Sequence, residues 1–498
     1  MSVWRVYGAL AASIRQACRD TRLYTHDSTN EGEKMTDMTR AHTCADAHEC
    51  ARERAYTHED ARAHKRKNTQ AQSVPAPALA PAPAPAPAPT HSHIFSPSRK
   101  AFLKICAAGS ALAGLALSQS GCKRKSGNAD VAAQIDDSRA EYIIDPKTNE
   151  SNYTYTDFSL QEKGSWEIPL GNILRPSSGS WIAATTAGTS ATPVIKGSAF
   201  SLESGKLIEV LKEPYMKKTP NFVIFDVSCS DEIYAWLEFD TIEKGWYLFA
   251  SAFSKGALTG EVTELWHADE NYAPAKFAVS GKHVIWQVTP FAKKKKARES
   301  ATLYLWSLGQ AQADAILESK GAFATAPTIS GDVVVVVPRL AREGAGVAHV
   351  MQAYSISSGM KSVVDEFAMP SGVAPQTAVY INNHFVFSVA ANHQQRGLLG
   401  KMGTYIACSD GSFVVLSREP SAACAGSKNT IIIRSKVSYF VVDIENKSYS
   451  ILAASPRTSD VGEFPCVSGE SRFFITYATL KDKDTGYPKN ILIRRFII

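Results

Sequence analysis

The stretch Pro-Thr-Ile-Ser-Gly-Asp-Val-Val-Val-Val-Val at residues 327–337 joins a tight turn to a continuously apolar run. Gly and Asp supply the backbone freedom that a turn needs, and β-branched residues favour extended strands. A short apolar run between turn residues is typical of a strand that is buried on both faces. The stretch therefore predicts a strand, a tight turn and a second strand in the interior of a protein.

The same layout recurs along the last two-thirds of the chain. Seven turns each precede an apolar run, and they stand at Ser178-Gly179, Ser230-Asp231, Ser280-Gly281, Ser330-Gly331, Asn382-Asn383, Gly426-Ser427 and Ser468-Gly469. The steps between them are about 52, 50, 50, 52, 44 and 42 residues. A repeat of about this length is typical of propeller blades or solenoids.

Two further strand-like runs follow each apolar run. In the first unit they are 199–202 and 207–210, joined by a turn that contains Gly205. Proline recurs just before the first strand of several units, where its missing N–H costs least. Each repeat therefore predicts four antiparallel strands.

The last unit is one strand short. It supplies 466–467, 473–477 and 491–498, whereas the strand-like run 165–170 lies unassigned before the first unit. A ring of sheets must close or leave an exposed edge, and an N-terminal strand can complete the last sheet. The prediction is an all-β, seven-bladed β-propeller over 165–498 closed by an N-terminal strand, with six or eight blades as alternatives.

The pattern at 327–337 and the Ser-Ile-Ser-Ser-Gly turn at 355–359 resemble blades of TolB-like propellers and of the propeller domains of prolyl oligopeptidases. The resemblance covers about two-thirds of the chain and implies the propeller architecture. No Trp-Asp blade ending occurs, so the sequence does not support a WD40 propeller.

Residues 94–122 have the layout of an export signal, with a basic start, a short apolar stretch and small residues at its end. The basic motif resembles the twin-arginine signal, except that Lys100 replaces the second Arg; it comprises Ser98, Arg99, Lys100, Phe102, Leu103 and Lys104. The end resembles a lipobox, which implies lipidation of Cys122 and a membrane anchor. Plain cleavage and an uncleaved anchor are the alternatives.

The remaining N-terminal regions have little to form a core. Residues 1–93 are of low complexity and end in an Ala-Pro tract, which predicts disorder or a mis-assigned translation start. Residues 123–164 are interpreted as a polar spacer. A net charge of +6 is small for 498 residues, so nucleic-acid binding is not predicted.

No catalytic or metal motif stands out, and neither a metal nor a cofactor is predicted. The histidines of the repeat region lie in no metal-binding spacing; they are His267, His283, His349, His384 and His393. Cys229, Cys424 and Cys466 occupy equivalent places in their units and are expected to be buried free thiols.

One basic loop is a candidate site for anions. It lies between strands two and three of the third unit and contains Lys293, Lys294, Lys295, Lys296 and Arg298. Its functional interpretation is a loop that contacts wall polymers or lipid headgroups. A solvated hairpin tip is the alternative.

These features predict an exported cell-envelope protein, either lipid-anchored or extracellular, whose propeller binds an envelope protein, peptide or glycan. The alternative is a hydrolase or lyase that acts on polymers with carboxylates at the channel mouth, and a third is a scaffold. The centre of the ring discriminates among them. Clustered carboxylates or histidines would favour catalysis, an aromatic mouth would favour ligand capture, and a plugged channel would favour scaffolding.

Overall fold

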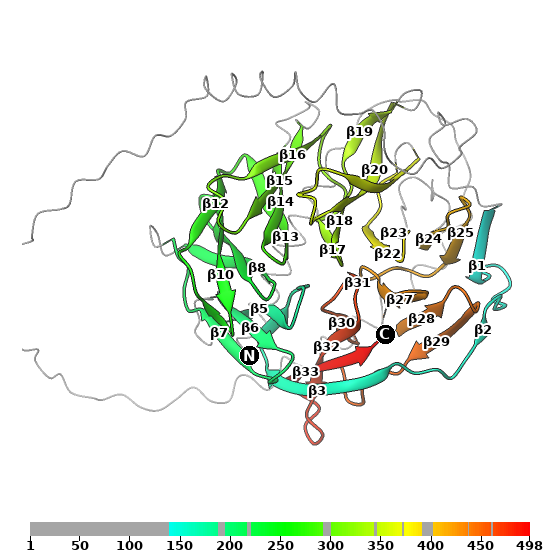
Figure 1. Cartoon of the computed structure of the whole chain (residues 1–498). Helices are drawn as coiled ribbons and strands as arrows, with labels where there is room; N and C mark the ends of the chain where they lie inside the picture. Colours follow the sequence, from blue (N-terminus) through cyan, green and yellow to red (C-terminus); the bar gives the residue numbers. More distant parts are fainter. Residues whose placement is uncertain are drawn as a thin grey trace, which may run out of the picture. The chain divides into compact units, whose positions relative to one another are not determined.

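The computed structural model describes residues 139–498 apart from 188–194, 217–220, 292–299, 343–345, 371–372, 391–401, 437 and 460–461. The described residues belong to one compact unit and form seven β-sheets. Figure 1 shows the sheets following one another around a common centre in sequence order, so each sheet is a blade of a ring. The predicted all-β propeller is confirmed.

The first four blades each contain four main strands, and blades 2 and 4 carry one short extra strand. Blade 1 comprises β4 (Asn172–Leu174), β5 (Trp181–Ala187), β6 (Ile195–Ser201) and β7 (Leu207–Leu211). Blade 2 comprises β8 (Phe222–Cys229), β9 (Ile233–Asp240), β10 (Trp246–Ser254), β11 (Ala257–Leu258) and β12 (Thr263–Ala268). Blade 3 comprises β13 (Tyr272–Ser280), β14 (His283–Pro290), β15 (Ala301–Ser307) and β16 (Asp314–Ser319). Blade 4 comprises β17 (Thr328–Ser330), β18 (Val333–Val336), β19 (Arg339–Arg342), β20 (Gly346–Ser355) and β21 (Val363–Ala368).

The last three blades each gain a strand from before residue 170. Blade 5 comprises β22 (Thr377–Ile381), β23 (His384–Val389), β24 (Gly403–Ala407), β25 (Phe413–Leu416) and β1 (Ala140–Ile144). Blade 6 comprises β26 (Ala425–Ser427), β27 (Thr430–Ser435), β28 (Ser438–Asp443), β29 (Ser448–Leu452) and β2 (Thr154–Tyr155), and β31 (Gly469–Glu470) joins its inner edge. Blade 7 comprises β30 (Phe464–Pro465), β32 (Phe473–Lys481), β33 (Pro488–Ile497) and β3 (Gln161–Pro169).

The apolar runs are second strands, as predicted, and each blade packs on both of its faces. Val334 in β18 belongs to a core that blade 4 shares with blade 3, whereas Val335 belongs to the core shared with blade 5. Successive side chains of a strand point to opposite faces of its sheet. The unbroken valine run is therefore required because both faces of the strand are buried.

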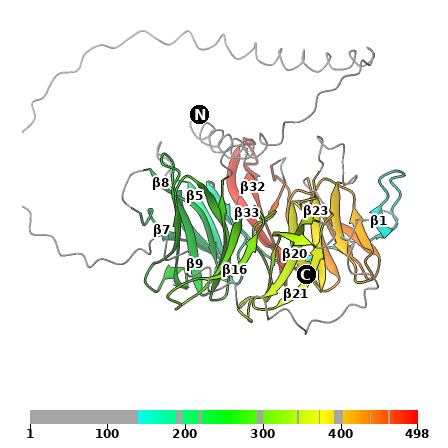
Figure 2. The same ribbon diagram turned by 90° about the horizontal axis from the view of Figure 1, so that it is seen from above.

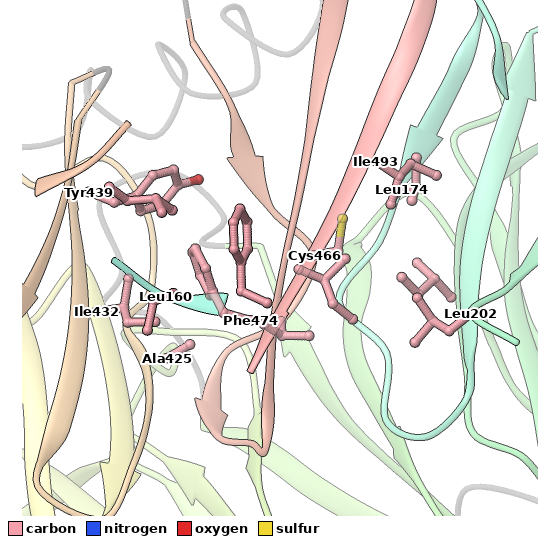
Figure 3. Packing of buried hydrophobic residues seen from close by; sticks show 14 of the residues in the cluster. Leu160, Leu174, Leu202, Ala425, Ile432, Tyr439, Cys466, Phe474 and Ile493 are labelled. Atoms are coloured by element: carbon pink, nitrogen blue, oxygen red, sulfur yellow. The ribbon is translucent and has the colours of Figure 1, made fainter. Parts of the chain in front are cut away.

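The ring closes where blades 6, 7 and 1 meet. Their shared core includes Ile432 of blade 6, Phe474 of blade 7 and Ile182 of blade 1, all at most 2% exposed. Figure 3 shows part of this core, in which side chains from both ends of the ring point toward one another. Hydrophobic packing thus continues between the first and last blades.

Strand β3 supplies the fourth strand of blade 7, which confirms the predicted closure. It pairs antiparallel with β33, with Trp166 opposite Ile493, and Figure 1 shows the two strands side by side. Arg494 of β33 adds a polar link, because its guanidinium lies 2.9 Å from Glu162 of β3 and 2.9 Å from the buried Glu463. The pairing turns β33 from an edge into an interior strand.

The segment before β3 forms a belt, defined here as residues 139–160. Its strands β1 and β2 pair in parallel with the outer strands of blades 5 and 6, and Figure 2 shows β1 at the margin of the ring. Three buried side chains fix it to the blade cores: Ile143, Tyr153 and Leu160. The sequence had suggested only a spacer here, because three apolar anchors spread over 18 residues form no period.

We expect Ile168→Ala in β3 to lower the free energy of unfolding by about 2–5 kcal/mol, since it leaves a cavity in the closing core. Leu170→Ala is the control, because Leu170 is 42% exposed. Chemical denaturation measures both variants. Equal effects would contradict the role given to β3.

Candidate binding site at the ring centre

Several predicted site residues lie outside the described residues. They are Ser98, Arg99, Lys100, Phe102, Leu103, Lys104, Cys122, Lys293, Lys294, Lys295, Lys296 and Arg298. The described part of the chain contains no helical segment with the length and hydropathy of a membrane span. Within the same ranges, no three His, Cys, Asp or Glu side chains gather closely enough to hold a metal ion.

The four described histidines are not brought together. His283 and His384 both begin second strands, in blades 3 and 5, and blade 4 separates them. Each bonds within its own blade: His283 Nδ1 lies 2.9 Å from Ser307 Oγ, and His384 Nδ1 lies 2.9 Å from the carbonyl oxygen of Ala407. They act as local links between strands.

The described cysteines are free thiols. Cys229, Cys424 and Cys466 are buried, and Cys408 is half-buried. Burial raises the pKa of Cys229 and of Cys424 to about 12. These thiols therefore stay protonated at neutral pH and serve as small apolar groups.

The recurring serine turns tie neighbouring blades together at one end of the ring. Ser230 Oγ of blade 2 donates to the carbonyl of Gly281 in blade 3 at 2.6 Å, and Ser330 Oγ of blade 4 donates to the carbonyl of Tyr380 in blade 5. Ser178 N of blade 1 donates to the carbonyl of Cys229 in blade 2 at 3.3 Å. We call this end of the ring the pinned end.

Hydrogen bonds also cross the centre at the pinned end. Ser178 Oγ of blade 1 donates to the carbonyl of Val279 in blade 3 at 3.0 Å. Glu470 N of β31, which joins the inner edge of blade 6, donates to Ser330 Oγ of blade 4 at 2.6 Å, and Figure 1 shows β31 next to β17. Gly469 permits this approach, because a Cβ there would lie 2.5 Å from the carbonyl oxygen of Ile329. Hydrogen bonds at this end therefore link blades that are not neighbours in the ring.

Charged residues stand at equivalent places in three consecutive blades, on the inner strand or directly after it. Arg175, Asp226 and Lys276 are separated by about 51 and 50 residues, the length of one repeat. Each stands three or four residues before its serine turn, which places it about 10–13 Å from the pinned end at the rise of a strand. Arg175 Nε lies 3.0 Å from Asp226 Oδ1, and about a third of each side chain is accessible, 34% and 37%. Lys276 is exposed.

The pair is accessible and yet lies deep within protein. Burial is the main cause that raises the pKa of the Asp226 carboxyl above its usual range, although the Arg175 guanidinium acts in the opposite direction. Protein therefore surrounds the carboxyl closely enough to raise its pKa, while about a third of the side chain stays accessible.

Blades 6 and 7 place aromatic and basic groups at the same level. Phe464 stands four residues before Ser468 on the inner strand of blade 7, and its ring centroid lies 5.8 Å from that of Tyr477. The buried guanidinium of Arg434 lies 4.3 Å from the Phe464 centroid. Burial raises the pKa of Tyr477 to about 12, while Arg175 and Arg434 both act to lower it. These groups are thus close enough to interact electrostatically.

Two phenylalanines of the inner strands keep large accessible surfaces. Phe225, next to Asp226, is 41% exposed, and Phe464 is 36% exposed. They belong to blades 2 and 7, with Arg175 of blade 1 between them. We define the channel layer by its seven members: Arg175, Phe225, Asp226, Lys276, Arg434, Phe464 and Tyr477. The layer combines accessible aromatic surface with three basic groups and one acid.

A shallow hollow between the outer parts of blades 4 and 5 is less suited to chemistry. It is lined by Asp365 and Glu366 of β21, by Phe385 and Phe413 of blade 5, and by Cys408. Burial raises the pKa of the Cys408 thiol, which keeps it protonated and weakly nucleophilic. The channel layer is therefore the stronger candidate site.

Sequence reasoning missed the channel layer, although one signal for it was present. The one-repeat spacing of Arg175, Asp226 and Lys276 is visible once the serine turns are aligned. Arg434, Phe464 and Tyr477 lack such a signal, because only the packing of blade 6 against blade 7 brings them together.

The fold and its central channel define a β-propeller. No family model matches the chain, and no curated protein matches its sequence. In structure it is similar to the β-propeller domain of the Trilobed protease from Pyrococcus furiosus, at 11% identity and a TM-score of 0.41 over 66% of this chain and 94% of that one.

Two peptidase structures are also similar to the chain. A prolyl endopeptidase matches at 10% identity and a TM-score of 0.43, over 67% of this chain and 50% of that one. The acylaminoacyl peptidase of Pyrococcus horikoshii matches at 9% identity and a TM-score of 0.39, over 67% of this chain and 52% of that one. The chain thus spans about half the length of these two peptidases, and the likeness is one of fold.

We expect Gly469→Ala to destabilise the fold more than Gly486→Ala. Both glycines have a positive φ, 73° and 70°, so each substitution carries a similar backbone strain of about 1 kcal/mol. Only at Gly469 would the added Cβ meet backbone, which adds about 1–3 kcal/mol. Equal losses in denaturation experiments would show that the contact across the centre contributes nothing.

We expect His349 to make the fold less stable in acid. Burial lowers the pKa of this histidine below its ordinary value of 6.5, so the unfolded chain binds more protons, and stability is lost as the pH falls through that value. His349→Asn should therefore flatten the pH dependence of unfolding between about pH 7 and 5. His267→Asn, at a side chain 66% exposed, is the control. An unchanged profile for His349→Asn would refute the assignment.

Proposed function

We propose that the chain is an exported cell-envelope β-propeller that binds a protein, peptide or glycan at the open end of its channel. One observation carries the proposal: Phe225 and Phe464 remain 41% and 36% exposed on inner strands, on either side of Arg175. Exposed aromatic surface in a concavity costs free energy in water and is typical of ligand sites.

The charges of the channel layer support the same proposal. The layer contains the basic side chains of Arg175, Lys276 and Arg434, and Asp226 pairs with Arg175. Basic groups on the low-dielectric wall of a channel focus a positive potential and attract anionic ligands. A ligand with both an apolar and an anionic part fits this layer best.

The closed ring supports binding in a second way. The belt and β3 cover the outer edges of blades 5, 6 and 7, and hydrogen bonds fix the pinned end. Side chains of the channel layer stand on this framework and need little reordering when a ligand arrives. Such preorganisation lowers the entropic cost of binding.

Export and anchoring are proposed from the sequence alone. The motif at Ser98 to Lys104 resembles a twin-arginine signal, and Cys122 stands where a lipobox cysteine would be. A TolB-like propeller behind such a signal would work outside the cytoplasmic membrane. Lipidation of Cys122 would tether the propeller there, and simple cleavage would release it.

Cell fractionation tests the anchor. We expect the full chain in the membrane fraction and the Cys122→Ser variant in the soluble exported fraction, because a diacyl anchor is lost. Cys408→Ser is the control, since Cys408 lies in the folded ring. Retention of Cys122→Ser in the membrane would contradict lipid anchoring.

Arrays of peptides and envelope glycans test the binding site. We expect Phe464→Ala to weaken a ligand found with the parent chain by about tenfold or more, because an aromatic anchor is removed. Phe158→Ala is the matched control, as Phe158 is 60% exposed on the belt. Equal binding by both variants would place the ligand elsewhere.

A second function is favoured by Asp226, whose side chain is partly accessible and whose carboxyl has a pKa raised by burial. A carboxyl of this kind suits general acid work in a hydrolase or lyase that acts on polymers. Turnover of a polymer by the parent chain that Asp226→Asn abolishes would favour this alternative. Binding without turnover favours the binding module.

A further inference from the structure

We infer that the group recognised in the channel layer is the terminal carboxylate of a peptide that ends in an apolar residue. This inference rests on the proposed binding function and makes it more specific. Three independent features lead to it: the free part of the Arg175 guanidinium, the hydrogen bonds at the pinned end and the two accessible phenylalanines.

The guanidinium of Arg175 has donors available for an anion. Its Nε is enclosed and lies 3.0 Å from Asp226 Oδ1, so a ligand can approach only the two terminal amino groups. Neither amino group donates a hydrogen bond to a described residue. Two parallel N–H donors match the two oxygens of a carboxylate, which makes such pairs strong and selective for geometry.

Lys276 adds a second positive charge on the same wall. It stands one repeat after Asp226 on the inner strand of blade 3, at the equivalent level, and it is exposed. Its charge adds to the positive potential that an anion held by Arg175 would experience.

The hydrogen bonds at the pinned end indicate that the ligand binds by the end of its chain. Glu470 N bonds to Ser330 Oγ across the ring, and Ser178 Oγ bonds to the carbonyl of Val279. These bonds link non-neighbouring blades and narrow the centre at the pinned end, so a ligand enters the channel layer from the open end. The channel layer lies about 10–13 Å above the pinned end, and the end of a chain fits this depth better than its middle.

The phenylalanines suit an apolar terminal residue. Phe225 and Phe464 offer accessible ring surface in the blades on either side of Arg175, and an apolar side chain loses contact with water when it packs on such a ring. An apolar side chain next to the bound carboxylate would have accessible ring surface to pack on. A peptide C-terminus has these two groups on one carbon.

Calorimetry with the full chain tests the inference with defined probes. The probes are acetylated Ala-Ala-Ala-X peptides with each of the twenty residues at X, each with a free carboxylate or as the C-terminal amide, and a galacturonate trimer. We expect apolar X with a free carboxylate to bind, and its amide to bind about tenfold to a hundredfold more weakly. Arg175→Gln should abolish the difference, and Lys276→Gln should reduce it.

Arg472→Gln is the matched control, because Arg472 is an exposed arginine in the turn at the pinned end. It should leave the preference for the carboxylate unchanged. Thermal unfolding confirms that each variant is folded; if Arg175→Gln is not, Lys276→Gln at an exposed side chain provides the test.

Two results would overturn the inference and leave the binding function standing. One is equal affinity for the acid and the amide peptides. The other is that the galacturonate trimer binds, that no peptide binds, and that Phe464→Ala abolishes binding of the trimer. If none of these probes binds, the inference fails. The binding function is tested separately by the arrays, which must contain a ligand whose binding depends on Phe464.

Discussion

The pairing of β3 with β33 is the constraint on which the rest of the molecule depends. A blade is a sheet buried on both faces, so it cannot be stable unless a neighbour lies on each side, and a row of blades always has two ends. Here the ends meet in one core that includes Ile182, Phe474 and Ile168. Because a strand from before the first blade completes the last one, separation of the ends would require breaking a β-ladder.

Closure of the ring also explains why inner strands are bonded together at one end of the centre and leave side chains accessible nearer the other end. Seven wedge-shaped blades leave a channel wherever their inner strands do not touch. The serine turns draw the inner strands together at the pinned end, with Gly469 admitting backbone where a side chain would clash. A few residues along the same strands, Arg175 and Phe464 keep accessible surface. The two ends of the centre therefore differ: hydrogen bonds join non-neighbouring blades at one end, and charged and aromatic side chains keep accessible surface farther along.

Most of the fold followed from the sequence, because blades are local units with a repeated pattern. The valines at 333–337 are apolar on both faces, and the turns recur at one period, so strands and closure could be predicted. The belt could not, since Ile143 and Tyr153 are isolated anchors whose partners lie some 270 residues away. The site was harder still. Arg434 and Phe464 meet only because two blades pack together, and no local pattern encodes that contact.

Hydrogen exchange along β33 tests the central claim of a closed ring most directly. Alternate amides of β33 point toward β32 and toward β3, so in a closed ring both sets are bonded within the sheet. If β3 completes blade 7, both sets, from residue 490 to residue 497, exchange at similarly slow rates. Fast exchange of every second amide, as on an open edge, would show that β3 does not complete blade 7 and that the ring is not closed by this strand.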